Sequence, residues 1–438
     1  MNDPCAARET ATTDGEGGVG CPHAAGDGAG ITSLFDPGAR RCPYPAYAQM
    51  RSHAPVSYLP LQALWVISRY EDCVFVLSHP ELFSSRESMS HTNAFRRSRR
   101  ALETLRRSRA YPRARTLVLA DPPAHTRYRR LMMRAFSAPR TAQDLAPRIA
   151  SLADERIDAF APAGHCEFVG EFAVPLAMGV IADVLGVPAG DIGLIRAWSE
   201  EFVAVQAGNV DESGLVAAAE STLAFEDYFI ALLEDRYARP RDDFIGRLVN
   251  LPSGETALEV REQLNLIMQM MVGGTENTIN FLGSSAHLLA TVPGLADHLR
   301  SEPGLILSAV EEVLRFETPT QGLFRVPTRD VEIGGVTVPR GARVMVNFGS
   351  ANRDETYFDE EFSPARVPPV PHLAFGRGVH ACPGQSLARR EGVIAIDRLV
   401  RRLPDLRLDP AHPPVRRDPF GVRGMQELHL LFTSAAFQ

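Results

Sequence analysis

The segment FGRGVHACPG, residues 375–384, restricts what this chain can fold into more than any other stretch. Pro383 suits the first position of a helix, because a proline lacks only an amide hydrogen that would be unpaired there. We therefore predict that Cys382 caps a helix running through QSLARREGVIAIDRLVRRL. The positive partial charge and free amide groups of a helix N-terminus stabilise a thiolate and lower its pKa. Gly376 and Gly378 let the preceding backbone approach a neighbour closely, where a Cβ would obstruct it.

Cys382 thus stands apart from the other cysteines. A thiolate held on a glycine loop suits a nucleophile or a metal ligand, and a buried cysteine beside a turn is the alternative. The remaining five are irregularly spaced without a C-x-x-C pair, which disfavours a disulfide scaffold or a zinc finger. We expect them to be small buried hydrophobic residues. They are Cys5, Cys21, Cys42, Cys73 and Cys166.

Composition excludes several classes of protein. The net charge is -7, from 53 acidic residues against 46 basic ones that are all arginine, which argues against a general nucleic-acid binder. No apolar run reaches the roughly 18 uncharged residues of a membrane-spanning helix. The N-terminus, MNDPCAARETATTDGEGG, lacks the basic-then-apolar pattern of a secretory signal. We therefore expect a cytoplasmic protein that binds neither nucleic acid nor membrane.

The order of patterns along the chain predicts one mainly α-helical domain with small β-sheets (α+β). Residues 1–30 are rich in Gly, Ala, Asp and Glu and are expected to be a disordered tail, leaving 31–438 as the domain. Short β-rich runs at 56–68 and 331–348 predict hairpins. Helical patterns dominate elsewhere, without the strand–helix alternation of a doubly wound sheet.

The pattern F-G-x-G-x-H-x-C-x-G in residues 375–384 resembles the haem-binding loop of the cytochrome P-450 family. The resemblance implies that haem b lies between a long distal helix and the helix after this loop. Cys382 would be the metal ligand, the axial thiolate whose electron density favours O–O cleavage. It further implies that His380 reaches a haem propionate and that Phe375 packs near the thiolate.

Two other motifs fit this resemblance. Glu312 and Arg315 lie at i and i+3, which alone predicts only a surface ion pair worth about 0.2–1 kcal/mol. In the family such a pair is buried beneath the haem and is joined by an arginine of an F-x-P-x-R segment. Here that segment is Phe362, Pro364 and Arg366.

Haem also carries two carboxylates, and arginine binds carboxylates bidentately. His125 and Arg129 lie at i and i+4, on one helical face, and resemble the H-x-x-x-R pair that contacts a propionate in the family. Arg325 stands at the position of a third propionate contact. The predicted cofactor-binding residues are therefore these three together with Phe375, His380 and Cys382.

The predicted distal helix, residues 257–291, departs from the family at one position. The usual pattern is A/G-G-x-D/E-T-T/S, and this chain reads GGTENT from Gly273 to Thr278. The acid is present as Glu276, but Asn277 replaces the alcohol. An amide donates and accepts hydrogen bonds, yet it does not easily pass a proton along. A water positioned by Asn277, or a substrate hydroxyl, would then replace the missing group, and Gly274, Glu276 and Asn277 are the predicted catalytic residues.

The resemblance implies a haem-thiolate monooxygenase that uses dioxygen to hydroxylate or otherwise oxidise a small organic substrate in specialised metabolism. The chain ends soon after its last predicted strand, so we expect no fused reductase, and electrons from a ferredoxin and its NAD(P)H-dependent reductase. Asn277 leaves open oxidative coupling or another non-hydroxylating oxidation. A haem-binding sensor without turnover is the alternative of another class.

The stretch from Arg86 to Arg115 contains ten arginines and only two acidic residues, Glu87 and Glu103. A solvated surface loop is the ordinary reading of such a charge run. The alternative is a patch that guides an anionic substrate, or one bound to an acidic carrier protein. A second basic set could receive an acidic electron donor, and ordinary solvated arginines on an exposed helix are the alternative. It comprises Arg389, Arg390, Arg401 and Arg402.

Overall fold

The computed structural model describes residue 34 and residues 37–86, 90–136, 142–207, 210–251, 253–366, 370–417 and 421–434. Helices predominate within this part of the chain and the strands form small sheets, so the predicted fold class is confirmed. The tail expected at residues 1–30 lies outside the described residues.

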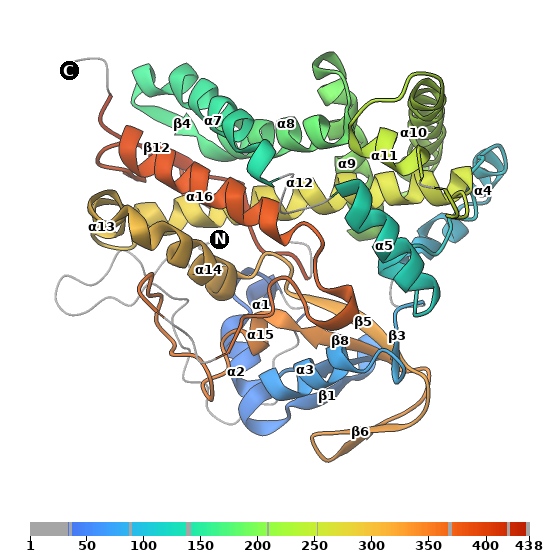
Figure 1. Ribbon diagram of the computed structural model, residues 1–438. Coiled ribbons are helices and arrows are strands. Elements are labelled where there is room, and N and C mark those ends of the chain that lie inside the picture. The colour runs from blue at the N-terminus through green and yellow to red at the C-terminus, as the bar shows by residue number, and fades with distance from the viewer. Residues whose placement is uncertain are drawn as a thin grey trace.

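The helices are numbered as in Figure 1. Their bounds are α1 Pro37–Arg41, α2 Tyr44–His53, α3 Tyr70–Ser78, α4 Arg99–Leu105, α5 Ala124–Phe136, α7 Ala146–Phe160, α8 Val174–Leu185, α9 Ile192–Ala207, α10 Glu212–Ala238, α11 Phe244–Val249, α12 Val260–Thr291, α13 Leu295–Ser301, α14 Ile306–Glu317, α15 Phe348–Ala351 and α16 Gln385–Arg402.

The largest described sheet has the order β1-β2-β8-β5-β3, in which only β2 and β8 are parallel. Its strands are β1 Val56–Leu59, β2 Leu64–Ile67, β3 Phe83–Ser84, β5 Gly322–Pro327 and β8 Arg343–Asn347. The smaller sheets contain β6 Val331–Ile333 with β7 Val336–Val338, β4 His165–Glu167 with β12 His429–Leu431 and β9 Arg407–Leu408, and β10 Val415–Arg416 with β11 Met425–Glu427. The two predicted hairpins are present as β1–β2 and β6–β7.

Helix α12 lies at the centre of the molecule. Its bounds, Val260–Thr291, agree closely with the long helix predicted over residues 257–291. It crosses the centre of Figure 1, with α16 and α14 beside it and the five-stranded sheet lower in the view. It packs against α8, α9, α14 and α16, and most of its length is buried. Within the described residues, neither α12 nor any other helix has the length and apolar character needed to cross a membrane.

The structure corrects two local expectations. Helix α16 begins at Gln385 with Gly384 as its N-cap, so Pro383 lies in the turn before the helix instead of at its first position. Cys73 and Cys166 are free and buried as expected, but Cys42 is disulfide-bonded, so a free buried thiol was the wrong expectation there.

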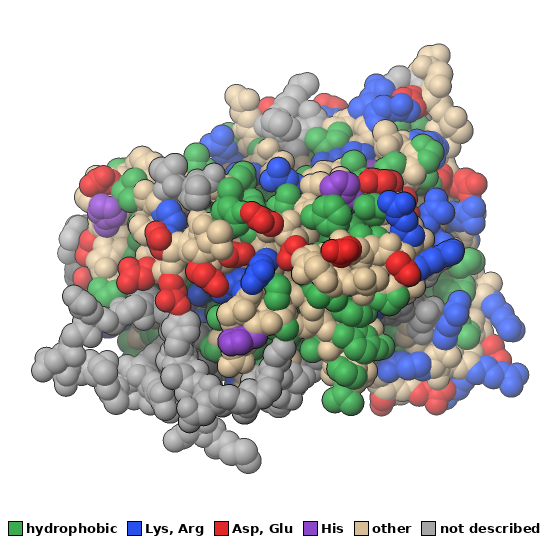
Figure 2. Space-filling view, turned by 90° about the horizontal axis from the view of Figure 1, so that it is seen from below, with side chains coloured by type: hydrophobic (Ala, Val, Ile, Leu, Met, Phe, Trp, Pro, Cys, Tyr) green, Lys and Arg blue, Asp and Glu red, His purple; other side chains and the backbone are tan. Residues whose placement is uncertain are grey.

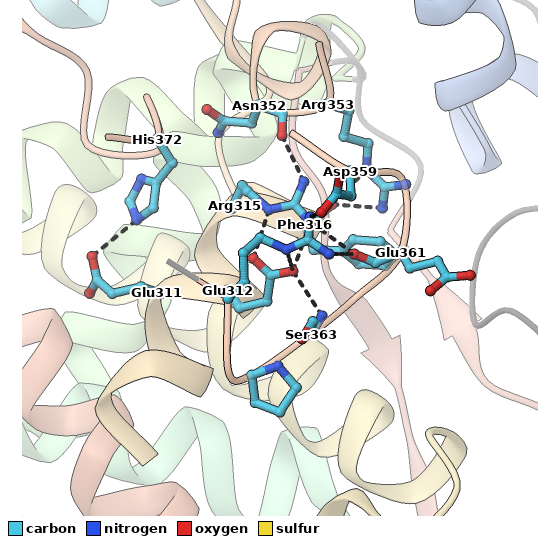
Figure 3. Close-up of polar contacts among 12 residues, drawn as sticks. Glu311, Glu312, Arg315, Phe316, Asn352, Arg353, Asp359, Glu361, Ser363 and His372 are labelled. Carbon is cyan, nitrogen blue, oxygen red and sulfur yellow. Dashed lines mark hydrogen bonds and ion pairs between the residues drawn. The ribbon is translucent and has the colours of Figure 1, made fainter. Parts of the chain in front are cut away.

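A buried ion pair on α14 ties together three segments that are distant in sequence (Figure 3). Arg315 Nε and Nη2 donate to the two carboxylate oxygens of Glu312 at 2.7 and 2.8 Å, and both side chains are almost completely buried. Arg366 Nε lies 3.4 Å from Glu312, as the F-x-P-x-R resemblance implied. The backbone N–H of Ser363 also donates to Glu312, and Arg315 donates to the carbonyl of Asn352.

This arrangement predicts a large cost for removing one charge of the pair. Glu312→Gln should lower the free energy of unfolding by about 3–5 kcal/mol, because the Arg315 guanidinium then stays buried without a counter-ion. Urea denaturation of the haem-loaded protein measures the loss. The control is Arg196→Ala, which breaks an exposed i,i+4 pair with Glu200 and should cost about 0.2–0.5 kcal/mol. Equal losses in the two variants would contradict the prediction.

Candidate active site

The cysteine loop is a tight turn closed by its own backbone. The N–H of Cys382 donates to the carbonyl of Phe375 at 2.8 Å. Gly376 and Gly378 have φ of +64° and +71°, a region that residues with a Cβ rarely adopt. A Cβ on Gly378 would lie 2.5 Å from the carbonyl oxygen of Leu77 on α3. The two glycines therefore allow the loop both to turn and to pack against α3.

The surroundings of Cys382 favour a thiolate only in part. Burial raises the pKa of the thiol, while the backbone N–H groups of Gly384 and Gln385 and the nearby guanidinium groups of Arg129 and Arg389 oppose that rise. The amides at the start of α16 lower the pKa as expected, but burial outweighs them and the balance is a raised pKa. Cys382 itself is only partly buried. Binding of the sulfur to a metal ion would deprotonate the thiol outright.

Two helices hold the loop from outside. Arg389 of α16 donates to both oxygens of Glu311 on α14, at 2.6 and 2.9 Å, and its guanidinium lies 4.6 Å from the centre of the Phe375 ring. His372, just before the loop, lies 3.2 Å from the same carboxylate (Figure 3). Although burial raises it, hydrogen bonds from His372 and Arg389 lower the pKa of Glu311 to about 2. Arg389 is therefore a structural residue more than a free docking charge.

The four predicted propionate contacts line one pocket, which is partly open to solvent. His125 lies on α5 with its ring 4.2 Å from that of His380 in the cysteine loop. Arg129 of the same helix donates to the carbonyl of Ala381, next to the cysteine, and Arg325 enters from β5. The other lining residues are Leu117, Val118, Leu323, Phe324 and Pro383.

This cavity is cationic and its charges are not balanced by the residues that line it. Burial and the neighbouring Arg325 lower the pKa of His380 to about 3, and burial lowers the pKa of Arg325 to about 10 despite Asp121 nearby. Burial and Arg129 lower the pKa of His125, whose Nε2 is buried with no hydrogen-bond partner. No acidic residue is among the described lining residues. Such a site fits a ligand that carries carboxylates.

The donor set fits haem. Donors that suit carboxylates line the pocket, and Pro383, which follows Cys382, lines it too. Arg129 connects the pocket to the cysteine, because it donates to the carbonyl of Ala381 and its charge acts on the Cys382 thiol. Cys382 would hold the iron, while His125, Arg129, Arg325 and His380 would hold the carboxylates. Phe375 packs on Arg389 beside the loop.

On α12, the two central glycines have different surroundings. A Cβ on Gly274 would lie 2.6 Å from Cδ1 of Ile181, so this glycine allows α8 to cross closely. No described atom lies within 4 Å of a Cβ built on Gly273, which faces open space. Asn277 is four residues further along and shares the face of Gly273. Gly273 therefore lies beside open space on the helix face that carries Asn277, while the role of Gly274 in catalysis stays a prediction.

Asn277 and Glu276 each have a partner that the sequence did not indicate. Thr320 Oγ1, just after α14, donates to Asn277 Oδ1 at 2.7 Å. Glu276 forms an ion pair with Arg417, next to β10. Thr278 points back into the helix, where its hydroxyl donates to the carbonyl of Gly274 at 2.9 Å. No local pattern marks Thr320 or Arg417, because both reach α12 from distant segments.

The cationic cavity predicts that Arg325 retains haem. Arg325→Ala should release haem about 10 to 150 times faster, since one charge-assisted hydrogen bond is worth about 1.5–3 kcal/mol. Transfer of haem to apomyoglobin measures the rate. Arg329→Ala removes an exposed arginine just beyond the same strand and serves as the control. Identical release from both variants would remove Arg325 from the set of haem contacts.

Comparisons with known proteins agree with this geometry. The family model for cytochrome P-450 matches residues 224–422. Cytochrome P-450 107B1 of Saccharopolyspora erythraea is 33% identical over 389 residues, 87% of this chain and 93% of the relative. Steroid C26-monooxygenase of Mycobacterium tuberculosis is 33% identical over 392 residues, 89% and 93% of the two chains. The solved structure of P450BioI in complex with hexadec-9Z-enoic acid ligated acyl carrier protein matches with a TM-score of 0.80 at 30% identity, covering 90% of this chain and 100% of that one. This chain therefore belongs to the cytochrome P-450 family of haem-thiolate monooxygenases.

Proposed function

We propose that this protein is a cytoplasmic haem b monooxygenase that oxidises a small organic substrate with dioxygen, using electrons delivered by a ferredoxin and its NAD(P)H-dependent reductase. The observation that carries the proposal is the cationic cavity beside the cysteine loop. Four side chains that can donate to carboxylates, His125, Arg129, Arg325 and His380, line this pocket, and none of its described lining residues is acidic. The two propionates of haem b supply the missing charge.

When bound, haem supplies the iron at which dioxygen is activated. Cys382 provides the sulfur ligand, and the helix-start amides of Gly384 and Gln385 partly stabilise the negative charge of that sulfur. The cationic cavity fixes the orientation of the cofactor through its carboxylates. On the opposite side, Gly273 leaves space and Asn277 offers hydrogen-bond donors. These residues bind, orient and donate hydrogen bonds around the reacting centre.

The proposed electron donor would find fewer free arginines than the sequence suggested. Arg401 pairs with Asp397, and Arg402 pairs with Asp154 and Asp158. Arg390 is exposed and has no ion-pair partner among the described residues. A ferredoxin docking near α16 would therefore meet a surface in which most positive charges are already balanced, with Arg390 as the exception.

The basic stretch supports an anionic substrate, including one carried by an acidic protein. Figure 2 shows basic side chains gathering along the edge of the molecule that carries α4 in Figure 1. Arg99 pairs with Glu103, and the pKa of Arg113 is lowered by burial to about 10, with its guanidinium 4.7 Å from the Phe202 ring. Six further arginines are exposed without an ion-pair partner among the described residues. They are Arg96, Arg97, Arg100, Arg106, Arg107 and Arg109.

The carrier form of this proposal predicts binding that depends on salt. Replacing Arg100, Arg106 and Arg107 with Gln should weaken binding of a palmitoyl-loaded acyl carrier protein by about ten-fold at low ionic strength, since each exposed charge contributes about 0.2–1 kcal/mol. The shift in haem spin state on titration measures the affinity. A triple variant at Arg196, Arg239 and Arg261, away from this stretch, is the control. Affinity that is insensitive to ionic strength would contradict charge-guided binding.

Asn277 supports oxidative coupling, or another non-hydroxylating oxidation, as the second candidate reaction, because the usual alcohol is missing from α12. Asn277→Thr should change the amount of product formed per NAD(P)H consumed. The amount of product per NAD(P)H should rise if a water in the variant's site passes protons. It should fall if the Asn277 amide is needed to hold a substrate hydroxyl that passes them. Assay with a surrogate ferredoxin system and identification of the product distinguish the cases. Unchanged coupling would remove Asn277 from the mechanism.

A further inference from the structure

The segment after α14 brings a hydroxyl to the place where α12 lacks one. Thr320 lies far from Asn277 in sequence, yet its hydroxyl donates to Asn277 Oδ1 at 2.7 Å. Both side chains are partly exposed although the segments around them are buried. A residue of another segment therefore contacts the position at which the family pattern has its alcohol.

The backbone around Thr320 is fixed on both sides by the turn before β11. Thr320 forms an isolated bridge with Val422. The N–H of Arg423 donates to the carbonyl of Pro319 at 2.9 Å, and the N–H of Gln321 donates to the carbonyl of Gly421 at 2.9 Å. These contacts use only backbone atoms, so they hold the Thr320 hydroxyl in place without depending on it.

The hydrogen bond also selects which end of the amide faces the site. An asparagine side chain has one accepting oxygen and two donating N–H groups. The oxygen is engaged by Thr320, and the NH2 group has no hydrogen-bond partner among the described residues. Asn277 shares its helical face with Gly273, beside which the structure leaves open space. We therefore place the free N–H groups of Asn277 on the face of α12 that borders the open space beside Gly273.

We propose that Thr320 is a positioning residue that orients the amide of Asn277, so that its NH2 group donates hydrogen bonds to the ligand on the oxygen side of the site. This inference rests on the proposed function, because it needs a ligand at the iron. It differs from both repairs expected from the sequence, since the Asn277 amide is itself the donor to the ligand and a hydroxyl of the protein orients it. Polarisation through the two successive hydrogen bonds strengthens the second one.

Cyanide bound to the ferric enzyme is a suitable probe, because this small anion reads hydrogen-bond donors at the oxygen side without substrate or electron donor. Thr320→Val removes the hydroxyl but keeps the shape and the backbone bridge. It should weaken cyanide binding about five-fold, as expected for the loss of one hydrogen bond of ordinary strength. Thr320→Ser retains a hydroxyl and should retain wild-type affinity. Thr278→Val is the matched control, since its hydroxyl bonds only to the helix backbone.

A double variant separates positioning from a general structural effect. Asn277→Ala should itself weaken cyanide binding, and adding Thr320→Val to it should cause no further loss. Cyanide affinity unchanged in Thr320→Val, or an equal further loss in the double variant, would overturn the proposal. If the proposed function itself is wrong, the wild-type protein will not give the carbon monoxide difference spectrum of a haem-thiolate protein. That result is distinct from any change in the cyanide affinity of the Thr320 variants.

Discussion

The buried charge of Arg315 is the constraint on which the cysteine loop depends. A guanidinium removed from water needs a counter-ion and a full set of acceptors, which Glu312 and the carbonyl of Asn352 supply. Asn352 Oδ1 in turn accepts from the N–H of Leu373 at 2.6 Å, and the carbonyl of Leu373 accepts from the N–H of Gly376 at 2.8 Å. One continuous set of hydrogen bonds thus runs from the ion pair on α14 to the loop that presents the sulfur.

The cationic cavity differs from this ion pair, because its lining residues include no acid and a bound ligand would have to supply the counter-charge. Burial is the first cause that lowers the pKa values of His125 and His380, and the neighbouring guanidinium groups of Arg129 and Arg325 lower them further. A ligand with two carboxylates would supply counter-charges to the buried guanidinium groups of Arg129 and Arg325, so part of its binding energy would come from offsetting their desolvation. Cofactor binding and stability of this region are therefore coupled.

The sequence predicted what local motifs encode and missed what the tertiary fold brings together. The cysteine loop, the Glu312–Arg315 pair and the long α12 follow from short patterns, and each is present. The start of α16 was placed too early, because the turn at Pro383 precedes the helix. Thr320 and Arg417 had no sequence signal, since their partners lie 43 and 141 residues away. The roles of neighbouring glycines on α12 likewise depend on which helix crosses there.

The central claim is that this fold holds haem iron through the sulfur of Cys382, with its carboxylates in the cationic cavity. Iron K-edge X-ray absorption of the haem-loaded ferric protein tests it most directly. The account predicts one sulfur atom in the first coordination shell of iron, lost in Cys382→Ser and retained in Cys166→Ala. A first shell of nitrogen and oxygen alone in the wild-type protein would contradict it.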